Sequence, residues 1–196
     1  MDRLAGERIR LRPLTLNERK LFFKWATHSD ATPFWYGDLY GDEVPSYSIF
    51  KLEWPDHYFL GNAPHMGRAY GIELNGRLIG EINYNEINEV DYSVSLDVII
   101  AEKTYHNKGY GTEAIVLLTR FLFDQYEIRK SQIEVISKNP RAYRAFEKAG
   151  YYHVYTYVRH EIVWHVLECM NKPAYPQHNG SRAPRQHAEK PENPSR

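Results

Sequence analysis

Residues 91 to 126 constrain the fold of this chain more than any other stretch. They begin with "DYSVSLDVII" (91–100), where apolar and polar side chains alternate as in a strand with one buried face. They end with "TEAIVLLTRFLFDQY" (112–126), whose apolar residues recur at helical spacing. Between the two lies "TYHNKGYGTEA" (104–114). This succession predicts a helix packed on a sheet, with a glycine-containing loop at the strand end.

The loop has two interpretations. The first N–H groups of a helix lack intrahelical partners and carry partial positive charge, so a glycine loop leading into a helix favours anion binding. Gly109 and Gly111 would allow positive φ and a close approach of backbone amides, Lys108 and His106 would add charge, and Thr112 a hydroxyl. Alternatively, the glycines serve only the geometry of a tight turn. The run "GYGTEA" excludes the dinucleotide fingerprint, and no G-K-[ST] is present.

The rest of the chain adds strands and helices in mixed order. Asn75-Gly76 between two alternating runs predicts a hairpin. Pro140 and Gly150 are placed as the first residue and the C-terminal cap of a short helix. The expected class is a mixed α/β (α+β) domain with one central sheet. Strands are expected at 8–14, 68–74, 77–87, 91–100, 131–137, 151–158 and 161–168, and helices at 16–29, near 46–53, at 112–126 and 140–150.

Composition limits the function classes. The chain has 196 residues and zero formal net charge, which gives no support for nucleic-acid or membrane partners. The single Cys169 excludes an internal disulfide and fits a cytoplasmic location. The scattered histidines predict no metal site. We expect one domain over residues 5–170, followed by a polar, disordered tail over 171–196.

Two motifs resemble the GNAT (GCN5-related) N-acetyltransferase family. "HNKGYGTEAI" is similar to the family's pyrophosphate loop, [Q/R]-x-x-G-x-[G/A], and "NPRAYRAFEKAGY" (139–151) is similar to its second signature. "ERIRLRPLT" also resembles its first strand. The resemblance spans nearly the whole domain. It implies a mixed, mostly antiparallel sheet of about seven strands flanked by helices.

The resemblance implies acetyl-CoA as co-substrate. The pyrophosphate would lie on the amides of residues 108–112, pantetheine along the strand end, and Asn139 would hydrogen-bond the pantetheine arm. Two departures from the family pattern stand out. His106 replaces a Gln or Arg, which predicts a weaker or pH-dependent contact, and Phe146 replaces the usual proton-donating Tyr. The expected acetyl-CoA residues are Val98, Ile99, Ile100, His106, Lys108, Gly109, Tyr110, Gly111, Thr112, Asn139 and Phe146.

Acetyl transfer to an amine also needs a base. Asp97 is the first candidate, because it lies on the polar face of the strand just before the loop; Glu81 and Glu86 are weaker ones. The departing thiolate would take a proton from Tyr143, Tyr151 or water, or leave unprotonated, since a thiol has a pKa of about 8.5. Tyr143 is preferred because it lies one helical turn from Phe146.

The acceptor is expected to be a small-molecule amine. "FWYGDLYGDE" (34–43) followed by "SLDVII" resembles aminoglycoside 6'-N-acetyltransferases, and Trp35, Tyr36 and Asp38 would bind that acceptor. The alternatives are a protein N-terminus, as in ribosomal-protein alanine acetyltransferases, or a polyamine. A non-catalytic acyl-CoA sensor is a further alternative. The protein is expected to be a monomer or a homodimer.

Overall fold

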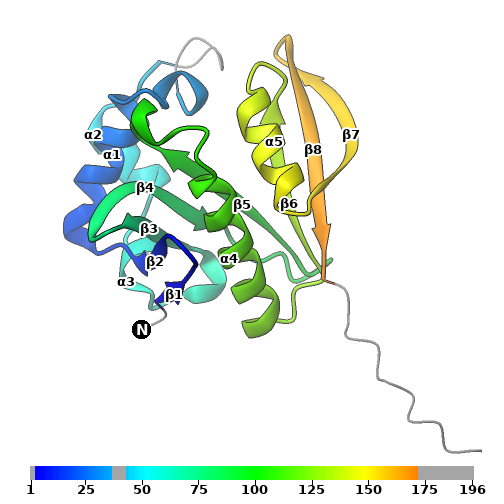
Figure 1. The fold of residues 1–196 in the computed structure, drawn as a ribbon, viewed down its shortest axis with the longest axis horizontal. Helices are drawn as coiled ribbons and strands as arrows, with labels where there is room; N and C mark the ends of the chain where they lie inside the picture. Colours follow the sequence, from blue (N-terminus) through cyan, green and yellow to red (C-terminus); the bar gives the residue numbers. More distant parts are fainter. Residues whose placement is uncertain (1–2, 37–42, 172–196) are drawn as a thin grey trace, which may run out of the picture.

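A computed structural model describes residues 3–36 and 43–171, which form an eight-stranded sheet with helices on both faces (Figure 1). The strands run in the order β1-β2-β3-β4-β5-β6-β8-β7, and β5–β6 is the parallel pair. The strands are β1 (Leu4–Ala5), β2 (Arg10–Pro13), β3 (Arg68–Leu74), β4 (Arg77–Tyr84), β5 (Ser93–Ile100), β6 (Lys130–Ile136), β7 (Tyr152–Arg159) and β8 (Ile162–Met170). The helices are α1 (Arg19–Thr27), α2 (Tyr47–Glu53), α3 (His57–Leu60), α4 (Tyr110–Gln125) and α5 (Pro140–Lys148), with short 3-10 turns η1 (Leu16–Glu18), η2 (Thr32–Phe34), η3 (Pro64–Met66) and η4 (Lys103–Tyr105).

This architecture confirms the predicted class, a mixed, mostly antiparallel sheet between helices. The additional strand is β1, whose two residues are too short to leave an alternating pattern. The hairpin at Asn75-Gly76 is confirmed, with positive φ at both residues joining β3 to β4. The helix expected at 16–29 is divided: a capping box between Thr15 and Glu18 starts η1, and α1 follows from Arg19.

Two hydrophobic cores cover the two faces of the sheet. One contains Ala114 and Leu118 of α4 and Phe146 of α5. The other contains Trp25 of α1 and Phe50 of α2. Even-numbered residues of β5 such as Leu96 pack in the first core, whereas odd-numbered residues face the second. The alternation read in "DYSVSLDVII" is therefore confirmed.

The sheet opens between β5 and β6. The two strands pair over residues 93–95 and 130–132 and then diverge. From there β5 stays on β4, and β6 stays on β8. Figure 1 shows the resulting halves, with β1–β5 on one side and β6–β8 with α5 on the other. In the part of the chain described, no helix is long and apolar enough to cross a bilayer.

Candidate active site

Two cavities meet where β5 and β6 diverge. The first, which we call the loop cavity, has a volume of about 390 Å³ and lies between the 105–112 loop and α5. The second, the strand cavity, has about 480 Å³ and lies between β5 and β6. Both are lined by Phe34, Trp35, Val98, Asn139 and Ala142. A molecule extended through the loop cavity therefore reaches the strand cavity at Val98.

The loop has the geometry of an anion site. Gly109 is the N-cap of α4 with φ 85°, a conformation that L side chains rarely adopt. Gly111, by contrast, lies in the first turn of α4, where a Cβ would meet only Ile100 Cγ1 at 3.7 Å. The expectation of positive φ thus holds for Gly109 alone. Gly111 instead leaves space, and that space borders the loop cavity.

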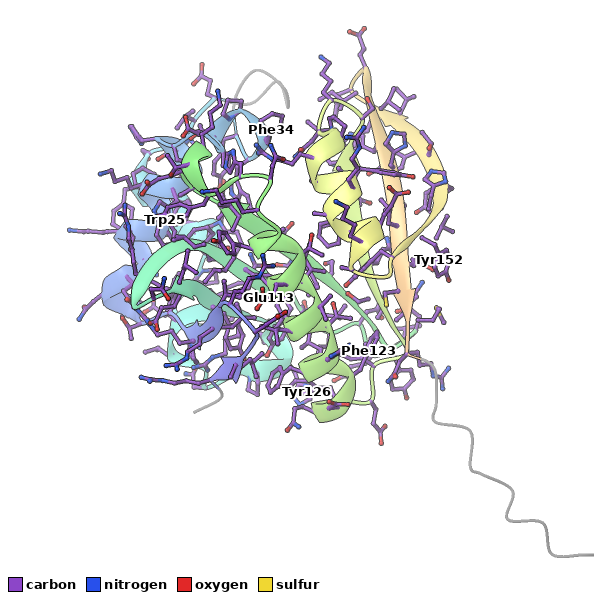
Figure 2. All side chains as sticks on the ribbon, in the orientation of Figure 1. Trp25, Phe34, Glu113, Phe123, Tyr126 and Tyr152 are labelled. Atoms are coloured by element: carbon purple, nitrogen blue, oxygen red, sulfur yellow. The ribbon has the colours of Figure 1, made fainter. Side chains whose placement is uncertain are left out.

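The loop and the start of α4 are held by the connection between β1 and β2. Arg8 Nη1 donates to the carbonyl of Lys108 (2.7 Å), and Arg8 Nε donates to Glu113 Oε2 (2.9 Å). Glu113 Oε1 accepts from the backbone N–H groups of Arg8 (2.8 Å) and Ile9 (3.2 Å). Burial would raise the pKa of the Glu113 carboxyl, but these hydrogen bonds and the guanidinium lower it below its ordinary value. Figure 2 labels Glu113 near the start of α4.

Glu113→Ala is expected to lower the free energy of unfolding by about 1–3 kcal/mol at pH 7, because the N–H of buried Ile9 loses its acceptor. Glu113→Gln should lose less, since it keeps an amide acceptor. Because the pKa of Glu113 is lower in the folded than in the unfolded state, the stabilisation by its carboxylate is present above the unfolded-state pKa. It is lost as pH falls through the folded-state pKa. Urea titrations at several pH values check this, and a loss that does not diminish in acid would contradict it.

His106 is held at the rim of the loop cavity by two hydrogen bonds. Arg141 Nη1 lies 2.7 Å from His106 Nδ1, which must accept because a guanidinium has no acceptor. Nε2–H then donates to the carbonyl of Ile100 at 2.8 Å. Arg141 also stacks over Phe34, with 5.3 Å between the guanidinium carbon and the ring centre. His106 thus joins the end of β5 to α5, which a Gln could also do.

Asp97 lies on β5 and lines the strand cavity. Its Oδ2 accepts from Asn85 Nδ2 at 3.0 Å, and Asn85 Oδ1 in turn accepts from the Tyr58 hydroxyl at 2.8 Å. Burial raises the pKa of the Asp97 carboxyl, the Asn85 hydrogen bond opposes this, and the charge of Glu134 adds to the rise. The carboxylate is therefore oriented and made more basic than an exposed aspartate.

The remaining predicted residues are distributed unevenly. Most of the residues expected to bind acetyl-CoA line the loop cavity: Val98, Ile99, Ile100, His106, Gly109, Tyr110, Gly111, Thr112 and Asn139. Lys108 is not among the lining residues, and its carbonyl accepts from Arg8. Phe146 borders the strand cavity. Asn139 caps α5, accepting from the Ala142 N–H at 3.1 Å. Tyr36 bonds Glu53 rather than lining either cavity, and Asp38 lies outside the described residues.

The tyrosines considered as proton donors are not brought to Asp97. Tyr143 lines a separate depression with His153 and His165. Tyr151 is buried, and its hydroxyl bonds Ser131 (2.7 Å) and Thr119 (2.8 Å). Of the weaker candidates for the base, Glu86 is exposed, whereas Glu81 is fully buried.

Sequence reasoning missed several residues that line the strand cavity. Glu134 and Gln132 reach it from β6, and Trp54 and Trp164 form part of its wall. The alternation in "SQIEVIS" gave a usable signal, because Gln132 and Glu134 are its polar members. Arg141 of the loop cavity was missed as well. In the part of the chain described, no group of three or more His, Cys, Asp or Glu could hold a metal.

Comparison with known proteins decides the family. A family model described as acetyltransferase (GNAT) domain matches residues 8–152. The chain belongs to the GNAT acetyltransferase family. The resemblance seen in the two motifs is thus confirmed, and this GNAT protein is an acyltransferase.

Curated and solved relatives of this GNAT protein include aminoglycoside-modifying enzymes. It is 26% identical over 156 residues to the aminoglycoside N(6')-acetyltransferase type 1 of Klebsiella pneumoniae, covering 75% of each chain. The AAC(6')-Ib structure with ribostamycin and coenzyme A superposes with a TM-score of 0.70 at 21% identity, over 90% of this chain and all of the other. The spermidine N-acetyltransferase of Vibrio cholerae with CoA and spermine gives 0.69 at 19%, over 84% and 96%. These structures share the fold.

Proposed function

We propose that this GNAT protein transfers the acetyl group of acetyl-CoA directly to a primary amine, and that its acceptor is the 6'-amine of an aminoglycoside. The observation that carries the proposal is the strand cavity. Two carboxylates, Asp97 on β5 and Glu134 on β6, line it together with Trp35, Trp54 and Trp164. Paired carboxylates among aromatic rings suit a polycationic sugar, whose ammonium groups need opposite charge and whose ring faces stack on tryptophan.

The loop cavity suits acetyl-CoA. Backbone N–H groups at the start of α4 would bind the pyrophosphate, aided by the helix dipole. Pantetheine would lie along the free edge of β5 opened by the divergence from β6, near Asn139. The thioester would then reach Val98, where the two cavities meet. N–H groups on that edge of β5 would polarise the carbonyl.

The chemistry needs one base and no covalent enzyme intermediate. Asp97 takes a proton from the ammonium, the neutral amine attacks the thioester carbonyl, and the C–S bond breaks as the C–N bond forms. The nitrogen then loses one of its two remaining protons to water and keeps the other as the amide N–H, while the thiolate takes a proton from water and becomes CoA thiol. Because the tyrosines considered lie elsewhere, we propose that the thiolate departs without an enzyme acid and is protonated by water, which a thiol pKa of about 8.5 permits.

A polyamine is the second candidate acceptor, because the same two carboxylates could hold two ammonium groups of a linear chain. The fold likeness to a spermidine acetyltransferase agrees with it. We further propose that the protein works in the cytoplasm as a monomer or homodimer. The single Cys169, which precludes an internal disulfide, supports the location.

Release of CoA thiol from acetyl-CoA tests the proposal against a panel of aminoglycosides, spermidine and an N-terminal peptide. We expect the highest kcat/KM with aminoglycosides that carry a 6'-amine. Faster turnover of spermidine or of the peptide would replace the acceptor while keeping the reaction. No release with any amine, despite binding of acetyl-CoA, would favour the acyl-CoA sensor.

A further inference from the structure

A second carboxyl group lies behind Asp97, fully enclosed in the protein. Glu81 on β4 has no exposed surface, and neither does Asn83. Glu81 pairs with Ile99 of β5, and Asn83 pairs with Asp97. Glu81 and Asp97 are thus diagonal neighbours on one face of adjacent strands, a relation that places their side chains about 7–8 Å apart or closer.

The hydrogen bonding of Glu81 is incomplete. Its Oε2 accepts from Asn83 Nδ2 at 3.3 Å. Among the described residues, Glu81 Oε1 and Asn83 Oδ1 have no hydrogen-bond partner. The surroundings are apolar, since Ala69 and Ile99, which flank this row, belong to the core beneath α1–α3. An ionised carboxylate is costly in such a place, whereas a protonated carboxyl needs far less solvation.

The charges that face Glu81 also favour its protonated form. Burial raises the pKa of the Glu81 carboxyl well above its ordinary value, Asn83 opposes this, and the charge of Asp97 adds to the rise. From α3, Tyr58 faces both carboxyl groups, and its own pKa is raised to about 12 by burial and by the charges of Asp97, Glu81 and Glu86. No cation is among the groups that shift the pKa of Glu81 or Tyr58 in the described part of the chain.

We propose that Glu81 and Asp97 form a coupled pair of carboxyl groups, in which Glu81 keeps a proton and so leaves the single negative charge of the pair on Asp97. A negative charge on Asp97 disfavours a second one on Glu81, and full burial makes the ionised form of Glu81 the more costly of the two. The charge falls on Asp97 because only Asp97 borders a cavity and receives the Asn85 hydrogen bond. Glu81 is then a positioning residue.

This role rests on the proposed function of Asp97 as the base. If Glu81 carried the charge instead, Asp97 would bind a proton more tightly and would enter the reaction already protonated. A neutral Glu81 therefore keeps Asp97 ready to accept the proton of the incoming ammonium. Glu81 works through Asp97, without touching the amine.

Infrared difference spectroscopy of the protein without substrates tests the pairing, because a protonated carboxyl has its own C=O absorption. In the wild type we expect that absorption at pH 7. Glu81→Gln should lose it, and the exposed Glu89→Gln should keep it. In Asp97→Asn, the absorption should titrate at a lower pH than in the wild type, because the neighbouring negative charge is gone. Absence of the absorption at pH 7, or the same titration midpoint in Asp97→Asn, would overturn the pairing.

Stability gives a second measurement that does not depend on catalysis. Because the folded-state pKa of Glu81 is raised, its stabilisation is full below the unfolded pKa and is lost as pH rises toward the folded one. The free energy of unfolding of Glu81→Gln should therefore rise relative to the wild type between pH 5 and pH 8; a constant difference would contradict a retained proton. If the titration of Glu81 depends on Asp97 but the protein transfers no acetyl group, only the proposed function is refuted. If the protein transfers acetyl groups but Glu81 titrates independently of Asp97, only the carboxyl pair is refuted.

Discussion

Asp97→Asn is expected to lower kcat by about 10²–10⁴-fold, the usual contribution of a general base. The substitution removes the proton acceptor but keeps a side-chain oxygen for Asn85, so the local geometry should survive. The KM for acetyl-CoA should stay within about twofold, because the base does not hold the cofactor. Steady-state thiol release measures both constants, and Asp124→Asn, at an exposed position of α4, is the matched control.

The pH dependence of kcat/KM tests the same assignment of Asp97 as the base. The pKa of Asp97 is raised by burial and by Glu134, so Asp97 gains its proton at a higher pH than an exposed aspartate does. The wild-type kcat/KM should therefore fall on the acid side with a midpoint above the ordinary aspartate value, and Asp97→Asn should lack this limb. An unchanged kcat, or the same acid limb in the variant, would contradict the assignment of the base.

Gly111→Val is expected to raise the KM for acetyl-CoA by about 100-fold or more, an effect of nearly 3 kcal/mol or above. Gly111 borders the loop cavity in the first turn of α4, where the pyrophosphate is proposed to bind. A branched side chain there occupies the space that the phosphate needs. The Cβ itself would lie 3.7 Å from Ile100 Cγ1, an ordinary contact, so folding should change little.

Gly109→Val is the informative comparison, because Gly109 has φ 85°. A β-branched residue is strained in that conformation, so this variant should lose stability as well as affinity. Gly111→Ala should lie between the wild type and Gly111→Val in KM. Calorimetric titration with CoA and thermal unfolding separate the two effects. Affinity for CoA that is unchanged in Gly111→Val would refute the assignment of the loop.

Sequence patterns of a few adjacent residues predicted the features that depend on local structure, namely strand faces and helix caps. The alternation along β5 correctly placed Leu96 and Asp97 on opposite faces of the sheet. The start of α4 is predicted at Thr112 but lies at Tyr110, because Gly111, assigned to the loop from its residue type, is helical and Tyr110 extends the apolar stripe of Ala114 and Leu118. Capping by Asn139 and Pro140 was readable, since it depends on adjacent residues.

What the sequence could not predict depends on how distant segments meet. No local sequence pattern marks the residues at which β5 and β6 stop pairing. That separation nevertheless opens the cavity that Asp97 and Glu134 both line. The contact between Arg8 and Glu113 joins residues 105 positions apart. Tyr143 was expected near Phe146, but a separation of three residues rotates the side chain enough to reach a different depression.

We propose that this GNAT protein acetylates the 6'-amine of an aminoglycoside. The most direct measurement compares thiol release from acetyl-CoA with a 6'-amino aminoglycoside and with its analogue bearing a 6'-hydroxyl, followed by identification of the acetylated position. We predict rapid turnover of the amine, acetylated at the 6' nitrogen, and little or none of the hydroxyl analogue. Equal rates for the two, acetylation at another amine, or preference for spermidine would contradict the claim.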